Sequence, residues 1–284
     1  MWIKIGIQEM GPFTLVTLRV LFTMLGLLAV FAFKRPEWKF REYWKIFFLL
    51  GLFNIVTPFV LISWSEQHIS SGLAAILNST VPLFTIILAP LFLPDDQFSL
   101  PKVLGLAVGF VGVVVLMSNQ LAGGLSWHFA GQITMLLAAM SYAASAVFAR
   151  RMTQGLTPVA QALGQMTMAM LIIVPTAAVV ESPFTLPRLP ISWLSVAWLG
   201  LLGTCLGTLL FFSLLHSVGP TRTTLVSYLF PLVGVLLGVI ILGEELDWRL
   251  AVGGVLIISG VVIVNQTKAV PSIAKPAYEV SSER

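Results

Sequence analysis

In two long apolar stretches of this sequence, polar residues come shortly before a proline. The two sets are Asn78 and Ser79 before Pro82, and Ser227 and Tyr228 before Pro231. A proline inside a helix removes one backbone hydrogen bond and frees a carbonyl oxygen. In an apolar environment such groups are tolerated where protein buries them or where they line a wet cavity. The pattern predicts a polar path for a solute. The alternative is a pair of packed kinks whose polar groups join neighbouring helices.

Five further residues could act on a solute in the same path. Asn54 and Tyr142 lie deep in apolar stretches, so we add them to the predicted substrate pathway. Arg19 is about 9 Å inside its helix, and it either snorkels outward or presents a charge to the pathway. Gln165 takes the matching place in the second half of the chain. Trp64 is a candidate gate residue, with an interfacial anchor as the alternative.

Several kinds of chemistry lack the residues that they need. The sequence contains no P-loop, no metal-binding spacing of His and Cys, and no Ser, His and Asp arrangement typical of hydrolases. We therefore predict a protein that is not an enzyme and that needs no cofactor or metal. All acidic residues lie at the ends of apolar stretches or between them, Glu66 being the nearest to an interior. A carboxylate proton relay has no obvious place.

The composition identifies the environment in which these residues act. The chain of 284 residues is 57% hydrophobic and 10% charged, with a mean hydropathy of +0.96. Soluble domains carry about 25% charged residues, so the sequence predicts an all-α integral membrane protein in a lipid bilayer. In a membrane protein, the net charge of +4 reflects basic residues that set the orientation in the bilayer. A nucleic-acid partner is therefore not expected.

Nine apolar segments are candidate membrane helices, which need about 20 residues, and two of them, 103–118 and 250–264, are shorter than this. They are 13–33, 46–64, 70–93, 103–118, 129–149, 158–180, 193–215, 223–243 and 250–264. Residues 1–10 are too short to cross a bilayer. We interpret them as the end of a truncated first helix, which brings the expected bundle to ten helices.

The two halves of the chain repeat one pattern. In 70–116 and again in 221–264, a proline is followed by an acidic turn and then by a glycine-rich segment that ends in Gly-Val-Val. We predict two five-helix repeats, 1–118 and 127–266, and a disordered cytoplasmic tail, 267–284. Because five is odd, the repeats must have opposite orientations, which is the inverted layout of many carriers.

Basic residues predict the orientation of the bundle. With the loop around 34–45 placed in the cytoplasm, twelve Lys and Arg residues fall inside and four fall outside or near the outer face. This predicts a multi-pass protein of the plasma (inner) membrane with a cytoplasmic C-terminus. Glycine pairs four residues apart, such as Gly105 and Gly109, predict close helix packing. That packing is either within the bundle or in a homodimer through the fifth and tenth helices.

Two stretches and one arginine carry a resemblance to a known family. The stretches are ISSGLAAILNSTVPLFTIILAPL at 69–91 and GEELDWRLAVGGVLIISGVVIV at 243–264, and the arginine is Arg19. Together they resemble the EamA-type transporters of the drug/metabolite transporter superfamily. The resemblance implies ten helices, cytoplasmic termini and export of amino acids or other small metabolites.

The combined prediction is a secondary carrier. It exports small organic metabolites by alternating access, with two four-helix sets moving against each other around a central cavity. Its expected partners are a small-molecule substrate and the lipid bilayer. The alternative function is that of a non-transporting membrane protein that binds lipid or assists assembly.

Overall fold

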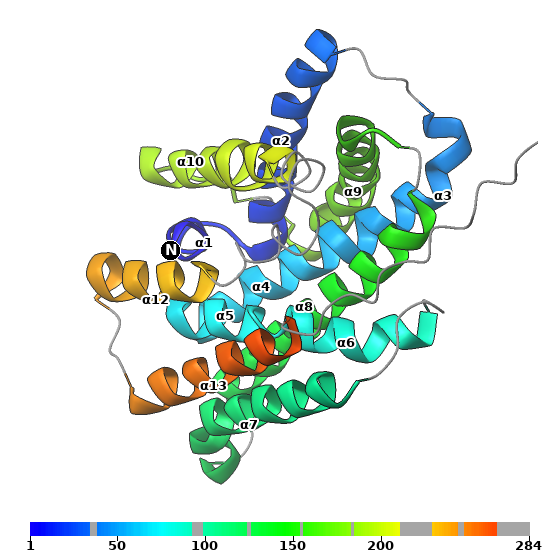
Figure 1. The fold of residues 1–284 in the computed structure, drawn as a ribbon. Coiled ribbons are helices and arrows are strands. Elements are labelled where there is room, and N and C mark those ends of the chain that lie inside the picture. The colour runs from blue at the N-terminus through cyan, green and yellow to red at the C-terminus, as the bar shows by residue number, and fades with distance from the viewer. Residues whose placement is uncertain are drawn as a thin grey trace, which may run out of the picture.

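Helices make up almost the whole structure, which is a computed structural model (Figure 1). It describes residues 1–34, 39–92, 99–123, 126–153, 156–182, 185–210, 229–243 and 247–265, and within these ranges it contains no strand. The helices are α1 Trp2–Gly6, α2 Pro12–Lys34, α3 Phe40–Leu50, η1 Gly51–Val56, α4 Thr57–His68, α5 Ser71–Asn78, α6 Val81–Phe92, α7 Leu100–Gly123, α8 Trp127–Met152, α9 Pro158–Val180, α10 Pro190–Ala197, η2 Trp198–Leu206, α12 Leu229–Leu242 and α13 Trp248–Asn265.

Seven helices of the described part are long and apolar enough to cross a membrane, and Trp248–Val264 is a shorter apolar helix. The chain is thus an all-helical, multi-pass membrane protein, as predicted. The expected span 223–243 lies partly outside the described residues. The count of ten helices and the inverted repeat remain predictions.

Hydroxyl side chains begin three of the helices. Ser70, Ser126 and Thr157 precede α5, α8 and α9, and each accepts a hydrogen bond from the backbone N–H three residues later, at 3.2–3.3 Å. Such N-caps satisfy N–H groups that have no partner inside the helix. They set where a span starts after each short connection.

The start of α2 is capped by an acid from the end of α9. Glu181 accepts hydrogen bonds from the N–H groups of Phe13 and Thr14 at 2.9 and 2.8 Å, and from the Thr14 hydroxyl at 2.6 Å. A carboxylate at a helix N-terminus also interacts favourably with the helix dipole. The contact places the C-terminus of α9 beside the N-terminus of α2, so these two packed helices run antiparallel. We call this end of the bundle the Glu181 end.

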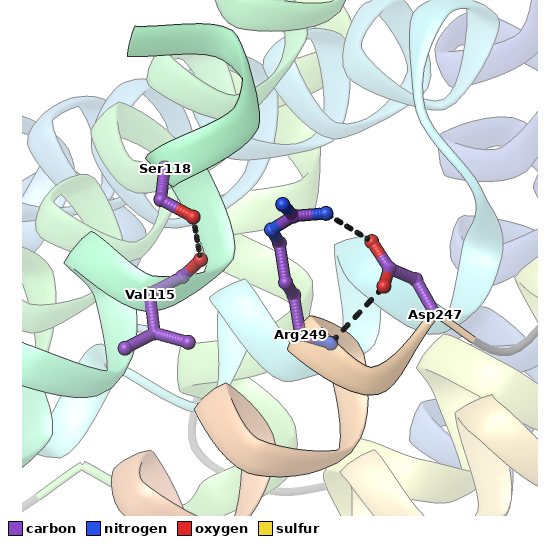
Figure 2. Close-up of polar contacts among 4 residues, drawn as sticks. All are labelled: Val115, Ser118, Asp247 and Arg249. Carbon is purple, nitrogen blue, oxygen red and sulfur yellow. Dashed lines mark hydrogen bonds and ion pairs between the residues drawn. The ribbon is translucent and has the colours of Figure 1, made fainter. Parts of the chain in front are cut away.

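Helices α7 and α13 lie side by side (Figure 1) and pack through glycines. A Cβ atom at Gly105 would lie 2.5 Å from the carbonyl oxygen of Gly260, and one at Gly112 would lie 2.7 Å from that of Gly253. Of the two predicted uses of the Gly105 face, the structure shows packing within the chain. At the start of α13, Asp247 accepts the Arg249 N–H at 3.3 Å and pairs with its guanidinium at 3.2 Å, close to the end of α7 (Figure 2).

Two apolar clusters form most of the core. One is built chiefly from α2, η1, α4 and α9, and the other from α4, α5, α7, α8 and α13. Tyr142 of α8 packs against both clusters. Tyr142 therefore lies where the two clusters meet.

Three predicted spans are not single regular helices. The span predicted at 70–93 with an interior proline is two helices, because α5 ends at Asn78 and α6 begins at Val81. The spans predicted at 46–64 and 193–215 contain the π-helical segments η1 and η2. Apolar length predicts that a segment crosses the bilayer, but it does not report these local changes in helix geometry.

Candidate functional site

A buried polar contact joins α2 to η2. A Cβ atom at Gly200 would lie 2.8 Å from the carbonyl oxygen of Arg19, so the two backbones touch because position 200 has no side chain. One turn further along η2, the Thr204 hydroxyl accepts a hydrogen bond from Nε of Arg19 at 2.9 Å. The Arg19 guanidinium also lies 3.7 Å from the centre of the Phe59 ring, an attractive cation–π arrangement. Arg19 thus faces protein and does not extend to the membrane surface.

A second contact of the same design joins α9 to η1. A Cβ atom at Gly51 would lie 2.9 Å from the carbonyl oxygen of Gln165. One turn further along η1, Asn54 donates from Nδ2 to Oε1 of Gln165 at 3.2 Å. The Asn54 oxygen accepts from the hydroxyl of Ser145, on α8, at 3.0 Å. Three of the chain's membrane helices meet here through neutral hydrogen bonds.

The two π-helical segments offer carbonyl groups to hydroxyl side chains. Ser141 of α8 donates to the Phe53 carbonyl in η1 at 2.6 Å. Thr23 of α2 donates to the Gly200 carbonyl in η2 at 3.0 Å. π-helical turns inside α-helices are rare and are frequent at functional sites. Here they hold polar groups inside spans that are otherwise apolar.

Sequence position places the two contacts toward opposite ends of the bundle. Arg19 is seven residues after Pro12, the first residue of α2, and Gln165 is seven residues after Pro158, the first residue of α9. At 1.5 Å per residue, each lies about 10 Å from the start of its helix. Since α2 and α9 run antiparallel, the charged contact lies nearer the Glu181 end and the neutral contact nearer the other end.

Tyr142 and Glu66 complete the surroundings of Arg19. Both are close enough for the charge of Arg19 to act on them. Glu66 of α4 is buried, and its Oε2 accepts a hydrogen bond from the Ser71 hydroxyl at 3.2 Å. Donors and acceptors from α2, η1, α4, α8, α9 and η2 are therefore gathered in the interior of the bundle, where a polar solute would need them.

The proline region does not have the geometry that the sequence predicts. Pro82 is the second residue of α6, where its missing N–H costs little. The hydroxyl of Ser79 donates to the Ile76 carbonyl at 2.6 Å, within its own turn. Asn78 ends α5, and its side-chain oxygen is buried without a hydrogen-bond partner among the described residues. Of this set, Asn78 has the feature expected beside a ligand or water.

The second proline set is described in part. Pro231 lies in α12, Leu229–Leu242. Ser227 and Tyr228 lie outside the described residues, so their place in the pathway remains a prediction.

Trp64 lies near the Glu181 end in a stack of rings. Its ring centre is 4.2 Å from that of His68 and 6.3 Å from that of Trp127, and the His68 ring stacks on Trp127 at 5.5 Å. Trp64 is thus part of an aromatic cluster formed by α4 and the start of α8, separate from the contacts of Arg19 and Asn54.

Sequence reasoning missed Gly51, Gly200, Thr204 and Ser145. One signal was available for the glycines: Gly51 and Gly200 are separated by 149 residues, as are Pro82 and Pro231. No comparable signal pointed to Thr204 or Ser145, because hydroxyl residues are common in membrane helices. Among the described residues, no group of three or more His, Cys, Asp or Glu side chains is placed to hold a metal ion.

Comparisons with known proteins identify the family of the chain. A model of the EamA-like transporter family matches residues 1–118 and 129–266. The chain is 28% identical to the uncharacterized inner membrane transporter YedA of Escherichia coli, over 99% of this chain and 92% of YedA. It is also 28% identical to a probable terminal-alkyne amino-acid exporter of Streptantibioticus cattleyicolor, over 73% of this chain and 68% of that protein.

A solved crystal structure shares the fold. It matches with a TM-score of 0.64 and 19% identity, over 93% of this chain and 92% of the other. The resemblance noted in the sequence is confirmed by the family match, which covers both halves of the chain. This chain, with its buried polar contacts between membrane helices, is a member of the EamA-like transporter family.

Proposed function

We propose that this protein is a secondary carrier that exports amino acids or similar small organic metabolites by alternating access. The observation that carries the proposal is the pair of polar contacts in the interior of the bundle, Arg19 with Thr204 and Asn54 with Gln165. Polar groups inside a membrane are costly and mark pathways for solutes. The name of the Streptantibioticus relative supports amino acids as the substrate class.

The arrangement also supports the alternating-access part of the proposal. Each contact joins one helix to a π-helical segment through a glycine, and the two contacts lie toward opposite ends of antiparallel helices. An inverted repeat in which each half supplies one such contact would give a carrier two similar closures on opposite sides of a midplane site. The predicted Lys and Arg bias favours an orientation with the Glu181 end on the outer side and the C-terminus in the cytoplasm.

Transport by the purified protein tests the proposal. Proteoliposomes loaded with an unlabelled amino-acid mixture are placed in trace amounts of each radiolabelled amino acid, and exchange into the vesicles is recorded. We expect exchange of at least one amino acid, and a loss of about tenfold or more in Gln165→Leu. Leu171→Ala, a change at an exposed position of the same helix, should exchange at the wild-type rate.

The contrary results are specific. If folded wild-type protein exchanges none of the amino acids, export of this class is wrong. If the vesicles instead show protein-dependent movement of labelled phospholipid between leaflets, the lipid-binding alternative is favoured. Equal loss in Gln165→Leu and Leu171→Ala would mean general damage to the bundle.

A further inference from the structure

A hollow with several polar side chains in its wall opens at the Glu181 end, apart from the interior contacts of Arg19 and Asn54. Its volume is about 370 Å³, within the range of small-molecule sites, which is roughly 300–1,000 Å³. Its polar lining comes from α1, the segment after α1, the end of α4, the connection to α5 and the start of α8. The lining residues are Lys4, Gln8, Gln67, His68, Ile69, Ser70 and His128.

The charge of the lining favours an anion. One ammonium and two imidazoles face the hollow, and no carboxylate is among its lining residues in the described part. Cationic donors without a lining carboxylate attract and hydrogen-bond anions.

Two of these nitrogen-bearing side chains are held in place. The ammonium of Lys4 donates to the Ile69 carbonyl at 2.7 Å, which fixes it at the wall of the hollow. Nδ1 of His68 lies 3.0 Å from the Trp64 carbonyl oxygen. Because a carbonyl accepts and does not donate, Nδ1–H donates to Trp64, and in the imidazolium form Nε2 carries a second N–H that can be donated to an anion. The His68 ring stacks on Trp127 and has a tilted contact with Trp64, and these contacts restrict its orientation.

A buried amide one helical turn from the hollow also calls for a polar partner. Gln132 is four residues after His128 on α8, and therefore on the same side of the helix. It is fully buried, and neither atom of its amide has a hydrogen-bond partner among the described residues. Buried amides are rarely left without partners, so a water molecule or the polar end of a ligand would complete this one.

We propose that this hollow is a binding site for the carboxylate of a small organic acid or amino acid at the outer mouth of the pathway. Lys4, His68 and His128 bind the carboxylate. The amides of Gln8 and Gln67 and the hydroxyl of Ser70 bind an amino or hydroxyl group of the same molecule. The role in substrate release rests on the proposed export function, whereas binding itself does not.

Histidine signals give a direct test, because the chain has three histidines, His68, His128 and His216. Protein with ¹⁵N-labelled histidine, in phosphatidylcholine nanodiscs, is titrated with L-alanine, propionate and L-alaninamide at constant ionic strength. We expect the two carboxylates to shift the signals of His68 and His128 in a saturable way. Alaninamide, which lacks the carboxylate, should not. Signals are assigned with single His→Gln variants.

Variants separate the site from a general effect of charge. Lys4→Gln and His128→Gln should each weaken the binding of propionate by about tenfold or more, and His128 is exposed, so its replacement should not disturb folding. Arg188→Gln removes an exposed cation at the same end that does not line the hollow, and it should bind as wild type does. Equal weakening in all three variants would overturn the proposal.

Other outcomes identify another ligand or a failure of transport. If alaninamide shifts the signals as strongly as propionate, or if neither carboxylate shifts them, the carboxylate site is wrong. Signals that respond to phosphatidylglycerol nanodiscs but not to carboxylates would assign the hollow to a lipid headgroup and also overturn it. If carboxylates bind but no amino acid is exchanged in proteoliposomes, the site stands and the proposed export fails.

Discussion

The contact of α2 with η2 and the contact of α9 with η1 share one backbone design and differ in charge. In both, a glycine lets two helices touch, and a side chain one turn later bonds across the interface. In the first the bond is made by the Arg19 guanidinium to a hydroxyl, and in the second by one amide to another. Glycine placement thus sets the geometry, while the residue at 19 or 165 sets the chemistry.

The difference in charge leads to different expected energies. Hydrogen bonds that involve a charged group are roughly twice as strong as neutral ones, and a low local dielectric strengthens them further. The charged contact should therefore tie α2 to η2 more firmly than the neutral contact ties α9 to η1. In a carrier, the weaker of two similar contacts is the one expected to open more readily.

The largest effect is expected from the glycines, since both contacts depend on them. Gly200→Ala and Gly51→Ala would each place a methyl group within 3 Å of another helix's backbone. We expect each to cost about 3 kcal/mol in the free energy of unfolding, the upper part of the range for overpacking. Unfolding by SDS in mixed micelles measures this cost.

Gly203→Ala is the matched control for the glycine variants. It lies in the same π-helical segment as Gly200, and its new methyl would meet a single atom, 3.7 Å away. It should change the free energy of unfolding by about 0.5 kcal/mol or less. If Gly203→Ala costs as much as Gly200→Ala, then η2 tolerates no added side chain at either position. The close contact with the Arg19 backbone would then not account for the cost of Gly200→Ala.

The charged contact should give the next largest effect. In a double-mutant cycle with Arg19→Gln and Thr204→Val, we expect a coupling energy of about 1.5 kcal/mol, as for hydrogen bonds to charged groups. The cycle cancels the bond that Thr204 also makes to the Leu199 carbonyl. A coupling near zero would mean that Arg19 is held by Phe59 and general packing instead of by Thr204.

The neutral contact should be weaker. A cycle with Asn54→Leu and Gln165→Leu is expected to give about 0.6 kcal/mol, the average for hydrogen bonds between membrane helices. Both cycles are read from the same SDS unfolding curves. If the neutral coupling exceeds the charged one, the ranking of the two contacts is reversed, and so is the inference about which opens first.

The membrane spans were predictable because they depend on length and apolarity alone. The predicted helix at 158–180 has the bounds of α9. Other helices extend beyond the apolar stretch, as α7 does to Leu100–Gly123 around a prediction of 103–118. Polar residues can continue a helix past the hydrocarbon, so hydropathy underestimates its length.

The site was less predictable, because its parts come from packing between distant segments. Arg19 and Gln165 were selected as unusual polar residues, but their partners lie 185 and 111 residues away, and no local pattern encodes such pairs. The break before Pro82 was also missed. A proline limits helix geometry in either of two ways, as an interior kink or as the start of a new helix, and sequence spacing does not distinguish them.

The smallest effect is expected at Glu9, which ties the chain before α2 to the start of α10, the helix that continues into η2. A side-chain hydrogen bond with Ser192, followed by the N–H of Leu189, lowers the pKa of Glu9 below its ordinary value of 4.5. A lowered pKa in the folded state means that the ionised carboxylate stabilises the fold. This contribution is fully present above about pH 4.5 and is lost as the pH falls through the folded-state pKa.

Glu9→Gln tests this contribution because it removes the charge and keeps an oxygen that can accept from Leu189. At pH 7 the variant should unfold at a slightly lower temperature than wild type, and the difference should shrink as the pH is lowered from 5 to 3. Subtracting the two curves cancels the titration of the other carboxylates, which both proteins share. A difference in Tm that stays constant from pH 7 to pH 3 would mean that the charge of Glu9 does not help to hold α10 in place.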